Sequence, residues 1–186
     1  MNLTQSLLII ALLIGFSAFF SMAEISLAAS RRLRLRQMVD DGDPRAERVM
    51  KVQELPGEYF TVVQVGQNAV AILGGIVGEG ALSPFVAQSL QGWVEPSTAQ
   101  TVGFLASFTV VTSLFILLAD LLPKRLSMAD PEVVAVRVHQ PMQWCMSIFK
   151  PVVWFYSKCA DALFRLLGLS TIRDEKITFE DIVAMT

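Results

Sequence analysis

Three stretches of the chain carry no Asp, Glu, Lys or Arg, and each is long enough to cross a bilayer. They cover residues 1–23, 59–78 and 96–119, and the first extends to about Ala29 if Glu24 is tolerated in a span. A charge at the bilayer centre is costly, and about 20 apolar residues cross the hydrocarbon core. We therefore expect an all-α membrane protein with three transmembrane helices.

The charge content separates this chain from soluble proteins and from nucleic-acid binders. Only 17% of the residues are charged and 53% are hydrophobic, whereas soluble globular domains have about 25% charged residues. The 15 basic residues are outnumbered by 17 acidic ones, so no basic face for nucleic acid is expected. Cys145, Cys159 and the single His139 form neither a disulfide framework nor a zinc pattern.

Basic residues occur in two regions, 31–51 and from Lys124 onward. The positive-inside rule then predicts an external N-terminus, a cytoplasmic C-terminus and an external loop at about 83–100. A further apolar region, 138–169, is interrupted by charges and prolines, so we expect a helical belt at the membrane interface there. A cleaved signal peptide at residues 1–29 is the alternative for the first span, but its start lacks basic residues.

The predicted organisation has three parts. Residues 1–140 form a three-span transmembrane domain, in which 31–56 is a cytoplasmic amphipathic segment of two helices whose basic side chains contact lipid headgroups. Residues 141–170 form the juxtamembrane belt, and 171–186 begin a truncated cytoplasmic region. The pattern at 178–181 resembles a capping box and predicts a new helix there.

Polar side chains recur on one face of each predicted span, and intramembrane polar groups suggest function. They are Ser17, Ser21 and Glu24 in the first span, Gln64, Gln67 and Asn68 in the second, and Ser107, Thr109, Thr112, Ser113 and Asp120 in the third. Asn68 is expected near the midplane, and Ser21, Glu24 and Asp120 in the cytoplasmic half, around a pocket open to the cytoplasm. For Ser21, Asn68 and Ser113 the alternative role is interhelical hydrogen bonding. For Glu24 the alternative is a side chain that extends to the cytoplasmic interface.

The proline at position 123 predicts a helix break at Pro123 and Lys124. A proline cannot donate to the carbonyl four residues back, so the oxygen of Ala119 is freed beside the Asp120 carboxylate. Such oxygens recur at transporter ion sites, and we expect a cation-binding element here. The alternative is an ion pair between Asp120 and Lys124 one turn on.

Gly74, Gly75 and Gly78 contain a GxxxG step, which allows close packing of helices within the chain or between two chains. Because three spans are too few to enclose a pathway, we expect a homodimer. No signature of catalysis is visible, so the chain is not expected to be an enzyme. An intramembrane hydrolase using Ser21 with Asp120 is the weak alternative.

Three motifs occur in an order and spacing that resemble the transmembrane domain of the CNNM/CorC cation transporter family. They are SAFFSMAE at 17–24, QNAV at 67–70 and ADLLPK at 119–124. The resemblance implies a dimer of three-span protomers, a juxtamembrane belt and an inward-facing cation cavity. It also implies downstream CBS modules that bind adenine nucleotide, so no cofactor is expected in this segment.

The resemblance assigns cation binding to Ser21, Asn68 and the stretch 119–124, with Ser21, Asn68 and Asp120 as ligands if the cation is magnesium. This sequence has Ala119 and Asp120 where the family usually has Gly and Glu. Because Mg²⁺ demands near-ideal oxygen geometry, an acid shortened by one methylene leaves a metal site in question.

The same departure resembles a bacterial inner-membrane branch of the family that exports polyamines. This implies putrescine and cadaverine as substrates, and Glu24, Asp120 and the rings of Phe19, Phe20 and Phe115 suit a diammonium ion. Export from the inward-facing cavity by alternating access is the first hypothesis. Transport of magnesium or another divalent cation is the second, and a cation sensor without transport is the third.

Overall fold

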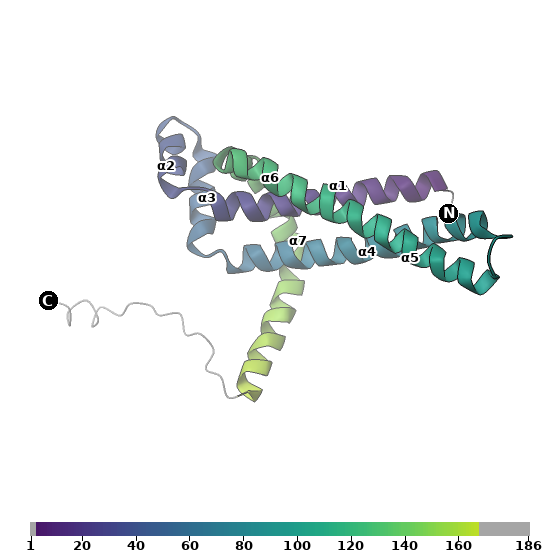
Figure 1. The fold of residues 1–186 in the computed structure, drawn as a ribbon. Helices are drawn as coiled ribbons and strands as arrows, with labels where there is room; N and C mark the ends of the chain where they lie inside the picture. Colours follow the sequence, from purple (N-terminus) through teal and green to yellow (C-terminus); the bar gives the residue numbers. More distant parts are fainter. Residues whose placement is uncertain (1–2, 168–186) are drawn as a thin grey trace. The chain divides into compact units, whose positions relative to one another are not determined.

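The computed structural model describes residues 3–167, and nearly all of them are helical. The elements in order are α1 (Leu3–Ala29), α2 (Arg32–Asp40), α3 (Pro44–Glu54), α4 (Gly57–Leu90), α5 (Pro96–Leu114), the π-helix η1 (Phe115–Leu121), α6 (Leu122–Ala129) and α7 (Pro131–Leu166) (Figure 1). The chain divides into two compact units after residue 148, within α7. The predicted capping box at 178–181 lies outside the described residues.

Three helices are long and apolar enough to cross a membrane, as the charge-free windows predict. They are α1, α4 and the continuous helix formed by α5, η1 and α6, which covers Pro96–Ala129. Among the described helices, α7 does not meet this criterion, although it is 36 residues long and runs through two prolines. The prediction of an all-α protein with three transmembrane helices is therefore confirmed.

The second span is longer than its charge-free window, and the predicted loop at 83–100 is wrong. Helix α4 continues past Glu79 and Pro84 to Leu90, and only residues 91–95 separate it from α5. Packing explains the extension, because Gly103 of α5 lies directly against the backbone of α4 at Ser83. Contact with α5 supports turns that hydrophobicity alone assigns to a loop.

Close packing of α4 against α5 and η1 depends on two glycines of the GxxxG step. A Cβ atom at Gly74 would collide with the ring of Phe115, and one at Gly78 would meet Val111 Cγ2 at 2.5 Å. Gly75 faces open space, with no atom within 4 Å of an added Cβ. Gly74 and Gly78 therefore serve packing within the chain, the first of the two roles considered from the sequence.

The predicted amphipathic pair is present as α2 and α3. The break covers residues 41–43, because Pro44 begins α3 and the Asp43 side chain caps it by accepting from the Arg45 N–H at 3.0 Å. Gln53 of α3 donates from its side chain to the Ser30 carbonyl at 2.9 Å. This bond satisfies an orphan acceptor near the end of α1 and attaches the pair to that span.

The first part of α7 is joined to the same end of α1. The Glu132 carboxylate accepts from the backbone N–H of Arg31 at 3.0 Å, across the turn that separates α1 from α2. His139 is buried, and burial together with the nearby Arg48 lowers the pKa of its imidazole. This segment therefore contacts the turn between α1 and α2, and its Gln140 side chain accepts from Arg48 of α3 at 3.5 Å.

Candidate cation site

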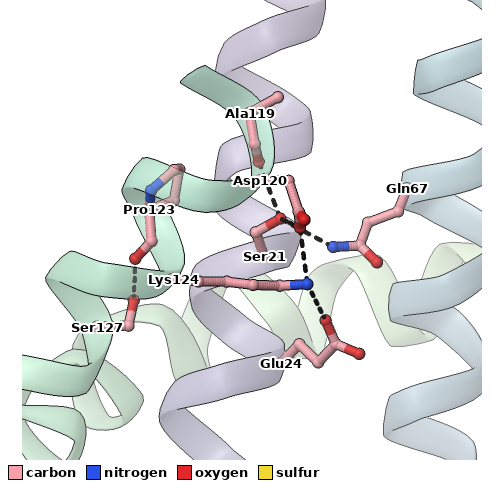
Figure 2. A network of polar contacts seen from close by, with 8 residues as sticks. All are labelled: Ser21, Glu24, Gln67, Ala119, Asp120, Pro123, Lys124 and Ser127. Carbon is pink, nitrogen blue, oxygen red and sulfur yellow. Dashed lines mark hydrogen bonds and ion pairs between the residues drawn. The ribbon is translucent and has the colours of Figure 1, made fainter. Parts of the chain in front are cut away.

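Ser21 lies at the centre of a polar cluster where α1, α4 and the third span meet (Figure 2). Its side chain is fully buried, and its hydroxyl lies 2.9 Å from the Ala119 carbonyl oxygen and 3.1 Å from Asp120 Oδ1. The hydroxyl also accepts from Gln67 Nε2 at 2.9 Å. Because it carries one proton, it serves only one of its two acceptors at a time.

A single ammonium group joins the two carboxylates of the cluster. Lys124 Nζ lies 2.7 Å from Asp120 Oδ1 and 3.5 Å from Glu24 Oε2, and Figure 2 shows it pointing between them. The three side chains remain accessible, with 31% of Lys124, 27% of Glu24 and 44% of Asp120 exposed. The site has a formal charge of about −1 and can be reached from outside the protein.

The backbone at the cluster is π-helical. In η1 the Leu122 N–H donates to the Leu117 carbonyl, five residues back, so the helix widens just before Pro123. The predicted break at Pro123 and Lys124 is wrong, because α6 continues the helix through both residues. The wider turn accommodates the proline without interrupting the helix, and the Ala119 oxygen is bonded to Ser21 instead of free.

Ser21, Glu24, Ala119, Asp120 and Lys124 come together as the spacing predicts, but Asn68 and Ser113 do not. Both are exposed, and within the described residues neither side chain makes a hydrogen bond. Gln67 reaches Ser21 in place of Asn68. The signal for Gln67 was its place on the polar face of the second span, where adjacent residues differ in direction by about 100°.

Comparison with known families decides what kind of membrane protein this is. Residues 8–186 match the family model described as the cyclin M transmembrane N-terminal domain. The chain belongs to this family. The predicted resemblance to CNNM proteins is thereby confirmed over almost the whole chain.

Relatives of this cyclin M domain include proteins named for export. It is 48% identical to the polyamine export protein of Salmonella typhimurium over 181 residues, which are 97% of this chain and 40% of that protein. It is 47% identical to the polyamine export protein of Haemophilus influenzae over 190 residues, 100% of this chain and 43% of that protein. An uncharacterized protein of Mycobacterium tuberculosis is 33% identical over 171 residues, 91% of this chain and 48% of that protein. The chain thus spans less than half the length of these relatives.

The acceptor groups of the site in this cyclin M domain are all oxygen atoms. Among the described residues, no group of three or more His, Cys, Asp and Glu side chains is placed to hold a metal ion. The acceptors present are two carboxylates, a hydroxyl and a backbone carbonyl, which are the partners that an ammonium group with three N–H donors requires.

Proposed function

We propose that this protein is a bacterial inner-membrane exporter of polyamines, and that Glu24 and Asp120 bind the substrate's ammonium groups. The observation that carries the proposal is the position of Lys124 Nζ, a primary ammonium in contact with both carboxylates. A polyamine ends in the same chemical group, so the site already accommodates the part of the substrate that it must recognise. The relatives named polyamine export proteins support the same substrate class.

The proposed site lies near one end of the bundle, which suits loading from one side of the membrane. Glu24 is five residues before the end of α1 at Ala29, and Lys124 is five residues before the end of α6 at Ala129. Both ends adjoin the region rich in basic residues that the positive-inside rule assigns to the cytoplasm. A cation in the cytoplasm therefore has the shorter route to the carboxylates.

Transport is proposed to require two copies of the chain that alternate between inward-open and outward-open states. An apolar groove of about 590 Å³ follows α4 and α5, and its lining includes Gly75, Phe104 and Phe108. The absence of a side chain at Gly75 leaves room for a helix to approach. We place the contact with the second copy along this groove.

Transport of a divalent cation is the second candidate. Its support is the group of three oxygens from Ser21, Ala119 and Asp120, since oxygen is the ligand atom that Mg²⁺ prefers. The Lys124 ammonium lies 2.7 Å from the same carboxylate and repels a metal ion as it repels any other cation, so it does not separate the two candidates. A sensor that binds cations without moving them uses the same residues and differs only in lacking flux.

Binding titrations with putrescine and with Mg²⁺ test the proposal. In lipid nanodiscs, Glu24→Gln and Asp120→Asn should each weaken putrescine binding about tenfold or more, because each removes a charge-assisted hydrogen bond. Ser113→Ala is the matched control and should bind as the wild type does, since Ser113 is exposed and away from the cluster.

Glu24→Gln should affect the binding of putrescine and of Mg²⁺ differently. A magnesium site built from Ser21, Ala119 and Asp120 tolerates Glu24→Gln, whereas a diammonium site does not. Putrescine binding that is unchanged in both carboxylate variants would contradict the proposal.

A further inference from the structure

The ammonium group of Lys124 lies where the proposed function places an ammonium group of the substrate. Its ammonium is shared by Asp120 Oδ1 at 2.7 Å and Glu24 Oε2 at 3.5 Å. A fixed cation of the same chemical type at the centre of a cation site is not needed for binding, and it reduces the attraction for any incoming cation. It therefore requires an explanation beyond ordinary pairing.

We propose that Lys124 is a tethered competitor, which fills the ammonium position while the site is empty and leaves it when a cationic substrate enters. This inference rests on the proposed function, because it concerns the same two carboxylates. Lys124 does not contact the substrate in this scheme. It determines instead how tightly the site holds a cation and how readily it releases one.

Lys124 lowers the electrostatic cost of the empty site. Without Lys124, the site would present Glu24 and Asp120 as two unneutralised carboxylates within a membrane-spanning bundle, which is costly at low dielectric. With Lys124 in place one of the two charges is neutralised, so the empty site is stable without a bound cation. An exporter must return empty after releasing its substrate, and a lysine that moves back between the carboxylates makes this possible.

The side chain of Lys124 has the freedom that this exchange requires. It is 31% exposed, and its contacts with the two carboxylates are its only ion pairs within the described residues. A lysine ammonium is a point charge on a flexible four-carbon stem, which can turn toward the headgroups when displaced. Its place on α6, one turn after Asp120, lets it leave the site without movement of the backbone.

A purely structural ion pair makes the opposite prediction for binding. If Lys124 only holds Glu24 and Asp120 in position, its removal disorders the site and weakens the binding of every cation. If Lys124 competes, its removal strengthens binding and slows release. The sign of the change in affinity therefore separates the two roles.

The experiment compares Lys124→Met with Arg125→Met in the protein in nanodiscs. Met is close to Lys in length and removes the charge. Arg125 is the matched control because it is exposed, adjacent and forms no ion pair with Glu24 or Asp120. Lys124→Met should tighten putrescine binding by about tenfold, because the substrate no longer has to displace two partly exposed ion pairs. It should also lower the rate of transport at saturating putrescine. Lys124→Arg should not tighten binding, because it keeps the competing charge.

Weaker or unchanged binding of putrescine by Lys124→Met, with Arg125→Met at the wild-type affinity, would overturn the inference. Lys124→Gln is the second variant if Lys124→Met does not fold, and the same tightening is expected. If the wild type binds Mg²⁺ and no putrescine, the proposed function has failed. The competitor role is then decided with Mg²⁺, whose binding Lys124→Met should also tighten.

Discussion

Ser21 is the residue on which the polar cluster depends. It is fully buried and bonds to residues of the other two spans, through Gln67 of α4 and through Ala119 and Asp120 of the third span. Glu24, Gln67, Asp120 and Lys124 are partly exposed, whereas Ala119 is buried and its carbonyl bonds to Ser21. Loss of the Ser21 hydroxyl therefore affects the whole site.

The variant Ser21→Ala should weaken both the site and the fold. Removal of the hydroxyl leaves the Gln67 amide and the Ala119 carbonyl without a partner, at a cost of about 1–3 kcal/mol. We expect a lower melting temperature in detergent and weaker putrescine binding, measured on the same preparation. The control Ser113→Ala should change neither quantity, and equal behaviour of the two variants would contradict the central position of Ser21.

Helical spacing predicted which residues of α1 and of the third span meet, but not the partner on α4. Ser21, Glu24 and Asp120 follow from spacing and depth, because each is on a narrow polar face. On α4 the polar face is wide, and the rotation of the helix about its own axis selects Gln67 over Asn68. That rotation is set by contacts with neighbouring helices, which spacing within one helix does not contain.

The expected position of Ser113 in the cluster differs from the structure for another physical reason. Ser113 and Asp120 are seven residues apart and share a face in a regular α-helix. The π-helical η1 begins at Phe115 and contains Asp120, so the angular phase changes after Ser113, and Asp120 meets Ser21 while Ser113 is exposed. A π-helix of this kind has no signature in a single sequence.

At the scale of elements, the hydrophobic pattern located each span but not its ends. The second span stops at Glu79 by charge, yet α4 continues to Leu90 because α5 packs along it. A Cβ atom at Gly103 of α5 would lie 2.7 Å from the Ser83 carbonyl oxygen, which is backbone and cannot turn away. The outer parts of α4 and α5 therefore depend on one close approach.

Gly103→Ala should separate these two helices and destabilise the protein by about 1–3 kcal/mol, as overpacking does. The measurement is the melting temperature in detergent, and the expected result is a clear decrease relative to the wild type. Gly80→Ala is the control, since nothing lies within 4 Å of an added Cβ there and Gly80 is outside the groove of the proposed dimer contact. A variant at Gly103 as stable as the one at Gly80 would show that the helices do not approach this closely.

At the scale of the whole molecule, the direction of transport depends on the orientation in the membrane. The basic residues at 31–51 predict that α2 and α3 face the cytoplasm, and this orientation remains a prediction. The site lies toward the same end of α1, so loading from the cytoplasm is expected only if this orientation is correct.

The two relatives named polyamine export proteins are more than twice as long as this chain. Nucleotide-binding modules, expected from the family resemblance, stay a prediction for the additional length. The polar cluster that includes Ser21, Asp120 and Lys124 lies entirely within residues 3–167. A test of export is therefore best made with the protein at its full natural length.

The most direct test of export is the uptake of labelled putrescine by membrane vesicles of opposite orientation. Inside-out vesicles expose the cytoplasmic face, and they should accumulate putrescine with the wild type and not with Asp120→Asn, whereas right-side-out vesicles should show no uptake. Equal uptake by wild type and Asp120→Asn, or uptake of Mg²⁺ without putrescine, would contradict polyamine export through this site.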